Sequence, residues 1–225
     1  MLLLAHRGYH AGLPENTMAA FDAATRLGID GIETDVRVSA AGEAVIMHDR
    51  VTPHQRAVAE LTRREIEHDV GHPVPLLAEA LDAFPEVLWD VEIKNPEAVP
   101  ATLAVLERYS GKRRLFVTSF RHDVVDAIAR QIAVDCGLLL AHRPLDIAAI
   151  IAGCAAQPRI RSMVWDYNIV DETVLRTVAA SGWGNYVYGA VSQAEHQHCA
   201  GLGLAGLITD YPQHILDRQS GAGEA

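Results

Sequence analysis

The sequence predicts one α/β domain made of repeated βα units, arranged either as a (β/α) barrel or as a doubly wound sheet. Apolar runs of strand length alternate with amphipathic stretches of helix length, which is the pattern of a parallel sheet with helical crossovers. The chain has 225 residues, of which 49% are hydrophobic, and this length suits one such domain better than two small ones. We expect the domain to span residues 1–219 and residues 220–225 to form a flexible tail.

Hydrophobic patterning places the individual strands and helices. The predicted strands cover residues 2–6, 30–36, 87–93, 114–119, 136–141, 162–167, 185–190 and 205–209. The predicted helices cover residues 17–27, 76–84, 97–108, 121–133, 144–156, 171–181, 192–202 and 212–218. The first helix is the best marked, because Asn16 can cap its start and Gly28 can take the left-handed conformation that ends it. Apolar side chains recur between them at helical spacing: Met18, Phe21, Ala24 and Leu27.

One segment departs from the βα alternation and predicts a small hairpin after the second strand. Residues 35–38 and 44–48 are strand-like and flank residues 40–43, which have the composition of a tight turn. A register symmetric about this turn places Asp35 opposite His48. A slip of one residue would turn the side chain to the other face, so this pairing is a prediction for the structure to test.

Charge, hydrophobicity and cysteine content limit the binding partners and the cellular compartment that the sequence predicts. The formal charge of -10 opposes binding to a polyanion, so we expect no nucleic-acid partner. The leading apolar run, residues 1–5, is too short for a signal sequence or a membrane span, and we expect no stable membrane association. Three widely spaced cysteines, Cys136, Cys154 and Cys199, suit reduced thiols in a cytoplasmic protein rather than disulfides or metal ligands.

Carboxylates and a lysine follow two of the predicted strands at alternate positions. Side chains alternate along a strand, so Glu33 and Asp35 share one face, and so do Asp90, Glu92 and Lys94. Inward carboxylates a few ångströms apart repel by about 4 kcal/mol per close pair at an effective dielectric constant near 20. A divalent cation removes that repulsion, and all-oxygen ligands favour Mg2+ or Ca2+. The alternative is that the carboxylates pair with Arg7, Arg37 and Lys94.

Two histidines reach the same end of the predicted sheet from different segments. His6 ends the first strand and His48 follows the hairpin. Cleavage of a phosphodiester needs one group that takes a proton from the attacking oxygen and another that gives a proton to the leaving alkoxide. For the remaining histidines we expect structural or solvent-exposed roles, and the pair His196 and His198 should lie on a solvated helix face. Those residues are His10, His54, His68, His72, His122, His142, His196, His198 and His214.

These motifs together resemble the glycerophosphodiester phosphodiesterase family. The stretch HRGYHAGLPENTMAAFDAATRLGIDGIETDV is similar to the opening motif of that family, EAVIMHD to its second histidine segment, VEIK to its third acidic segment, and GLAGLITDYP to its closing strand. The order of these short motifs is highly specific. The resemblance implies a TIM barrel, one bound divalent cation, and these roles: Glu33, Asp35 and Glu92 as metal ligands, His6 and His48 as the acid and base, and Arg7 and Lys94 on the substrate phosphate.

The chain departs from the family pattern at two places. Residues 50–75 are altered and short, so we expect this side to close the site less completely. The family usually shows an aromatic residue followed by Thr-Val-Asn near its end, whereas residues 188–192 read Tyr-Gly-Ala-Val-Ser, in which Tyr188 can take the aromatic role beside the substrate.

The activity that the resemblance implies is metal-dependent hydrolysis of a small-molecule glycerophosphodiester to sn-glycerol 3-phosphate and an alcohol by general acid-base catalysis. Two alternatives stay open: a related phosphodiesterase acting on a lysophospholipid or a sugar phosphodiester, and a catalytically silent barrel that binds phosphate. The sequence leaves the leaving alcohol, the preferred ion and the oligomeric state open.

Overall fold

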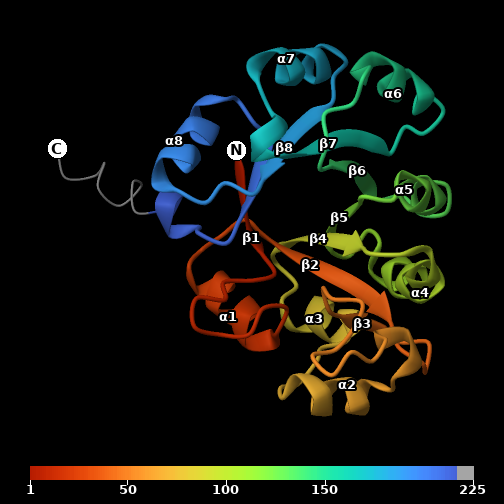
Figure 1. Cartoon of the computed structure of the whole chain (residues 1–225). Coiled ribbons are helices and arrows are strands. Elements are labelled where there is room, and N and C mark those ends of the chain that lie inside the picture. Colours follow the sequence, from red (N-terminus) through yellow and green to blue (C-terminus); the bar gives the residue numbers. More distant parts are fainter. Residues whose placement is uncertain (217–225) are drawn as a thin grey trace.

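Eight parallel strands close into a barrel in the computed structural model, which describes residues 1–216 (Figure 1). Each strand pairs with its neighbour in parallel, and pairing of the first two barrel strands, β1 and β2, completes the ring. A doubly wound sheet would leave two free edges, so the TIM barrel is confirmed. The barrel strands are β1 Leu2–His6, β2 Gly31–Val38, β4 Leu88–Ile93, β5 Arg114–Ser119, β6 Asp135–Leu140, β7 Ile160–Asp166, β8 Gly184–Tyr188 and β9 Gly206–Thr209.

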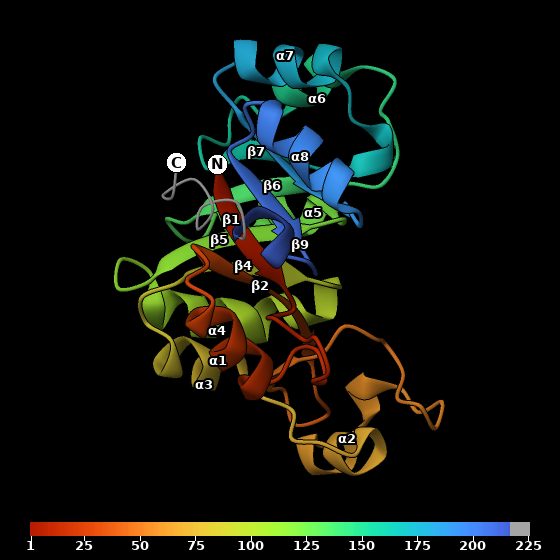
Figure 2. The ribbon, with the colours of Figure 1, turned by 90° about the vertical axis from the view of Figure 1, so that its left-hand side faces the viewer.

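Helices surround the barrel and connect its strands (Figures 1 and 2). They differ from the predicted helices by a few residues at their ends. The predicted helix at 212–218 lies partly outside the described residues, as does the end of the predicted domain 1–219, and the predicted tail 220–225 lies wholly outside them. The helices are α1 Met18–Arg26, α3 Leu77–Ala83, α4 Val99–Tyr109, α5 His122–Ala129, α6 Ile147–Gly153, α7 Glu172–Ala180 and α8 Gln193–Gly201, with short 3-10 turns η2 Pro96–Ala98 and η3 Tyr167–Ile169.

Apolar side chains fill the inside of the barrel below the site. They form a cluster separate from the larger core between strands and helices. Phe116 stacks on Tyr186 with ring centroids 5.0 Å apart. Glycines make room for both rings, because a Cβ atom at Gly206 would lie 2.5 Å from Tyr186 and one at Gly137 would lie 2.6 Å from Phe116. This apolar cluster closes the barrel beneath the charged residues that lie toward the carboxyl ends of β1, β2 and β4. The cluster contains Leu4, Leu88, Phe116, Leu139, Val164 and Ile208.

We expect Gly206→Ala to lower the free energy of unfolding by about 1–3 kcal/mol, because the added methyl group overlaps the Tyr186 ring in a packed interior. Gly153→Ala is the matched control, since a Cβ there meets nothing within 4 Å. Urea unfolding of both variants measures the difference. Equal stability of the two variants would show that the barrel interior can rearrange around the methyl group.

The predicted hairpin is present, but its register differs by one residue. β3 Ala44–Ile46 runs antiparallel to β2, with Val36 opposite Ile46 and Val38 opposite Ala44. Asp35 therefore faces Met47, whose N–H donates to the Asp35 carbonyl oxygen at 2.9 Å, and not His48. The turn takes residues 39–43, where the Ser39 N–H donates to the Glu43 carbonyl oxygen, and is one residue longer than predicted.

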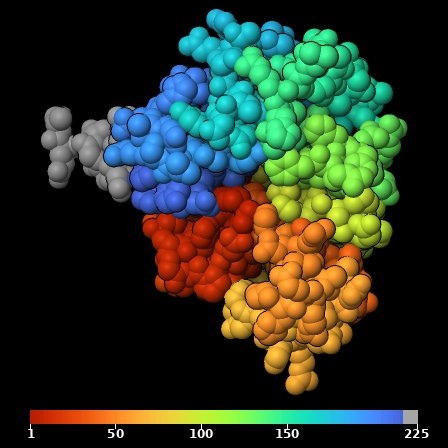
Figure 3. Space-filling model, in the orientation of Figure 1, coloured from red at the N-terminus to blue at the C-terminus, as the bar shows by residue number. Residues whose placement is uncertain are grey.

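Residues 49–76 form a folded extension rather than a bare short loop. They contain η1 Val58–Glu60 and α2 Arg63–Val70, a helix that the sequence prediction missed. Figure 2 shows α2 projecting away from the barrel, and Figure 3 shows the same segment, in orange, as a protruding lobe. The segment has its own apolar cluster with β3, made of Val45, Val58, Leu61, Ile66 and Val74. The sequence does carry the helix signals: Thr62 and Glu65 form a capping box and Gly71 ends α2 at φ 77°.

Candidate active site

A cavity of about 220 Å³ opens at the carboxyl ends of the barrel strands. All of the predicted site residues except Asp35 line it, and Asp35 is fully buried beside them. Further lining residues, not predicted for the site, are Asp90, Thr118, Phe120, Leu139 and Ile208. The alternation of side chains along β2 and β4 explains this gathering, because Glu33 pairs with Asp90 and Asp35 with Glu92 in register.

Three carboxylates form a compact, buried cluster. One oxygen from each of Glu33, Asp35 and Glu92 lies within 4.8 Å of the others. Burial and the neighbouring charges of Asp35 and Glu92 raise the pKa of Glu33 well above its ordinary value. Burial also raises the pKa of Glu92. Glu33 Oε1 is buried and has no hydrogen-bond partner among the described residues, so one acceptor in the cluster is left for a cation.

Two basic side chains neutralise part of this negative charge. Lys94 Nζ lies 3.0 Å from Asp35 Oδ1 and 2.7 Å from Glu92 Oε1, and Arg7 Nε lies 3.1 Å from Asp35 Oδ2. Burial opposes ionisation of Asp35, but Lys94 and Arg7 outweigh it and hold the pKa of Asp35 below its ordinary value. Among residues 1–216, the hydrogen bond that Glu33 accepts comes from the backbone N–H of Arg7, at 3.0 Å. Pairing with basic residues, the alternative from the sequence, thus accounts for Asp35 and Glu92 but not for Glu33.

Asn16 belongs to this site and not to a helix cap. The cap of α1 is Thr17, whose Oγ1 accepts from the Ala20 N–H, whereas Asn16 adopts a left-handed conformation at φ 56°. That conformation turns its side chain onto β2. Asn16 Nδ2 donates to Asp35 Oδ2 at 2.7 Å, and Asn16 Oδ1 accepts from Thr34 Oγ1 at 2.8 Å. The predicted termination by Gly28 is confirmed, at φ 74°.

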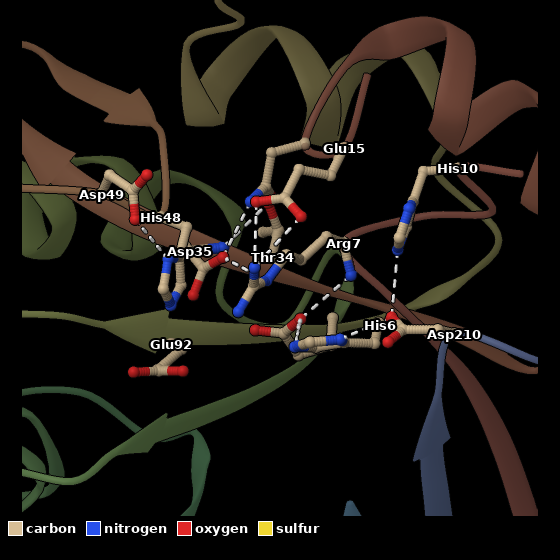
Figure 4. A network of polar contacts seen from close by, with 12 residues as sticks. His6, Arg7, His10, Glu15, Thr34, Asp35, His48, Asp49, Glu92 and Asp210 are labelled. Atoms are coloured by element: carbon tan, nitrogen blue, oxygen red, sulfur yellow. Dashed lines mark hydrogen bonds and ion pairs between the residues drawn. The ribbon is translucent and has the colours of Figure 1, made fainter. Parts of the chain in front are cut away.

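His6 is held by a carboxylate that the sequence prediction missed. Asp210 follows β9, and its Oδ1 lies 2.7 Å from His6 Nδ1 and 3.0 Å from His10 Nε2. Figure 4 shows both histidines directed toward Asp210. His6 Nε2 lies 3.9 Å from Glu33 Oε2. The signal for Asp210 was its place directly after the last strand, the same place that marks the other site residues. His10, predicted to be structural, thus contacts the site through Asp210.

His48 is paired in a similar way. Its Nδ1 lies 2.9 Å from Asp49 Oδ1, and its carbonyl oxygen accepts from Arg37 Nε at 2.8 Å. Burial lowers the pKa of His48 below its ordinary value, which favours the neutral ring near pH 7. In both histidines a carboxylate contacts Nδ1, so Nε2 is the ring nitrogen that this carboxylate does not engage.

Asp90 and Tyr188 line the cavity but do not belong to the three-carboxylate cluster. Burial raises the pKa of Asp90 to about 8, and Thr118 Oγ1 donates to it at 2.8 Å. Asp90 is thus mostly protonated at neutral pH. Tyr188 packs edge-on against Phe120, with centroids 6.0 Å apart, and its hydroxyl donates to the Leu140 carbonyl oxygen at 3.4 Å. These two rings contribute apolar wall to the cavity.

The prediction of a solvated face for the pair on α8 is wrong for His196. This ring is fully buried, with Nδ1 2.7 Å from the Ser192 carbonyl oxygen and Nε2 2.6 Å from Thr209 Oγ1. The end of β9 supplies a polar partner that helix spacing alone does not reveal. His198 is exposed, as predicted. The three cysteines are unpaired, and Cys136 and Cys199 are buried.

Comparison with known proteins decides the family. Residues 6–214 match the model of the glycerophosphoryl diester phosphodiesterase family. The chain belongs to this family. The predicted enzyme-family assignment is thereby confirmed.

Relatives in this family cover different shares of the chain. A glycerophosphodiester phosphodiesterase of Caldanaerobacter subterraneus subsp. tengcongensis is 26% identical over 96% of each chain. A Mycobacterium tuberculosis protein named "Probable glycerophosphodiester phosphodiesterase 2" is 34% identical over 60% of this chain, and the match spans 56% of that relative.

Solved structures share the fold. The glycerophosphodiester phosphodiesterase of Thermotoga maritima has a TM-score of 0.84 and 24% identity, over 97% of this chain and 98% of that one. An Oleispira antarctica phosphodiesterase, solved with the product sn-glycerol-3-phosphate, has a TM-score of 0.86 and 19% identity, over 100% of this chain and 97% of that one. Among the described residues of the present chain, no helix is both long and apolar enough to span a membrane.

Proposed function

We propose that this chain hydrolyses glycerophosphodiesters to sn-glycerol 3-phosphate and an alcohol, with one divalent cation bound. The observation that carries the proposal is the juxtaposition of a three-carboxylate cluster with His6, His48, Arg7 and Lys94 around one cavity. Family membership and the product bound to the Oleispira antarctica relative support the same reaction.

The residues fit a hard cation. Glu33, Asp35 and Glu92 offer only carboxylate oxygens, the ligands that a hard cation prefers. Neither Lys94 nor Arg7 bonds to Glu33 Oε1, so this oxygen can bind the ion. We therefore assign these three residues as ligands of Mg2+ or Ca2+. The bound ion would neutralise the buried charge and withdraw electron density from a phosphate oxygen.

His6 and His48 are proposed as the acid and base. Asp210 and Asp49 orient their rings through Nδ1, and each Nε2 exchanges a proton with the attacking oxygen or with the leaving alkoxide. Arg7 and Lys94 place positive charge beside the phosphate, where it stabilises the charge that builds up during the reaction. Tyr188 is the proposed contact on the glycerol side, through the apolar wall that it forms with Phe120.

Product analysis by 31P NMR tests the function. Incubation of glycerophosphocholine with the protein and Mg2+ or Ca2+ should give sn-glycerol 3-phosphate and choline. Phosphocholine and glycerol as products would mean that the other ester bond breaks and would refute the proposed orientation. Absence of turnover with every diester tested, from a folded protein, would favour the phosphate-binding barrel.

We expect Asp210→Asn to lower kcat by about 10- to 100-fold, because the carboxylate that fixes the His6 ring loses its charge. Asp123→Asn is a suitable control, since Asp123 is exposed, forms an ion pair with Arg121, and does not line the cavity. Steady-state kinetics on glycerophosphocholine measures both. A wild-type kcat in Asp210→Asn would show that Asp210 does not contribute to catalysis.

A further inference from the structure

The Asp210 carboxylate is shared between two histidines that lie four residues apart. Its Oδ1 is 2.7 Å from His6 Nδ1 and 3.0 Å from His10 Nε2 (Figure 4). An ionised carboxylate can only accept hydrogen bonds, so the ring nitrogen carries the proton in both contacts. The proposed function assigns proton transfer to His6 and orientation of its ring to Asp210. It leaves the second ring, His10, without a role.

The backbone at Asp210 is fixed from the barrel and from α8. Thr209, the last residue of β9, pairs with Ala5 of β1. Thr209 Oγ1 also lies 2.6 Å from His196 Nε2 and accepts from the Tyr211 N–H at 2.9 Å. These contacts hold the main chain on both sides of Asp210, but they leave its side-chain rotamer open.

The position of the Asp210 carboxylate depends on the two rings. The side chain is 38% exposed. Among residues 1–216, the hydrogen bonds that its oxygens accept come from His6 and His10. A single bond to His6 would leave the carboxylate free to rotate about that bond or to turn toward water. A second bond, from a separate ring, restricts both motions and keeps the acceptor against His6 Nδ1.

The loop after β1 presents His10 from a segment that is fixed to α1. The Tyr9 N–H donates to the Ala20 carbonyl oxygen at 2.9 Å, and the Leu13 N–H donates to the His10 carbonyl oxygen at 3.1 Å. Gly8, at φ 77°, packs so closely on α1 that a Cβ atom would lie 2.7 Å from the Ala20 carbonyl carbon. The His10 ring therefore reaches Asp210 from a backbone that is already ordered.

The charges agree with this arrangement. Burial opposes ionisation of Asp210, but the hydrogen bonds from His10 and His6 outweigh it and hold the pKa of Asp210 well below its ordinary value. The bond to Asp210 raises the pKa of His10 above its ordinary value. His10 can donate from Nε2 both as a neutral and as a protonated ring, so the contact persists in either state.

We propose that His10 is a positioning residue for proton transfer, which holds the Asp210 carboxylate against His6 Nδ1 and so orients the His6 ring. This inference rests on the proposed function. It goes beyond that function by giving a role to a histidine that neither lines the cavity nor belongs to the three-carboxylate cluster.

Two substitutions of His10 separate the N–H donor from the bulk of the ring. His10→Leu removes the donor, whereas His10→Gln keeps an N–H at a similar distance from the backbone. We expect His10→Leu to lower kcat for glycerophosphocholine by about 10-fold while KM stays within about twofold, because His10 does not touch the substrate cavity. His10→Gln should recover most of the loss. His142→Leu, at an exposed position, is the control and should keep the wild-type kcat.

A wild-type kcat in His10→Leu would overturn the proposal while leaving the proposed function intact. Equal losses in His10→Leu and His10→Gln, or a loss confined to KM, would also overturn it. Absence of turnover in the wild type with every diester tested would overturn the proposed function and this inference together.

A double-mutant cycle tests the route through Asp210. Asp210→Ala removes the carboxylate that His10 holds, so adding His10→Leu to it should lower kcat by less than about twofold further. A further loss as large as the one that His10→Leu causes in the wild type would show that His10 acts independently of Asp210 and would refute the assignment. Circular dichroism of the four proteins verifies that each is folded.

Discussion

His6→Ala and His48→Ala should each lower kcat for glycerophosphodiesters by about 100- to 10,000-fold, the range that a general acid or base contributes. Both rings line the cavity and both have Nδ1 engaged by a carboxylate, so Nε2 is the atom that each variant removes from the reaction. Stopped or continuous assays of choline release measure the effect, and circular dichroism verifies the fold.

A control for this experiment comes from a histidine outside the site. His142 lies on the loop after β6, is exposed, and does not line the cavity of the candidate site. His142→Ala should retain the wild-type kcat. If His6→Ala or His48→Ala also retained it, that ring would have no part in proton transfer.

Glu33→Gln should abolish metal activation and, at the same time, stabilise the metal-free protein by about 1–3 kcal/mol. The stabilisation follows because Glu33 is a buried carboxyl whose pKa is raised well above its ordinary value by burial and by Asp35 and Glu92. Glutamine keeps the shape and removes the charge. The thermal shift that Mg2+ or Ca2+ produces in the wild type should disappear in the variant.

The pH dependence of this stabilisation has a defined sign. The folded state holds the Glu33 proton more tightly than the unfolded state, so wild-type stability falls as pH rises from the ordinary value, 4.5, to the raised pKa. The variant lacks this loss. The two metal-free proteins should therefore be equally stable at low pH and diverge above about pH 4.5. Glu107→Gln, at an exposed position, should show no divergence. A Glu33→Gln protein less stable than wild type at neutral pH would contradict the unpaired-charge interpretation.

Periodicity predicted the alternating strands and helices but left a barrel and a doubly wound sheet open, and the family resemblance indicated the barrel. The alternation of side chains placed Glu33, Asp35 and Glu92 on one inner face, and the structure brings them together. Elements that depend on local geometry were harder to predict. The hairpin register depended on the length of the turn at residues 39–43. α2 is a short polar helix, and its capping residues indicate it more clearly than its hydrophobic periodicity does.

Residues whose role depends on a distant partner escaped the sequence prediction. Asn16 lies where a helix cap is expected, and only its left-handed backbone sends the side chain to Asp35. His10 lies 200 positions before Asp210, the partner that connects it to His6. His196 is buried because Thr209, on another element, satisfies its ring. Such contacts are set by barrel closure, which spacing along one strand or helix does not encode.

Metal titration of the stripped wild-type protein tests the central claim most directly. After removal of bound ions with a chelator, the rate of sn-glycerol 3-phosphate release from glycerophosphocholine is measured against free Mg2+ or Ca2+. The account predicts negligible release without added ion and a saturating rise that fits one ion per chain, lost in Glu33→Gln. Undiminished release in the presence of excess chelator, or a response to the ion that Glu33→Gln retains in full, would contradict it.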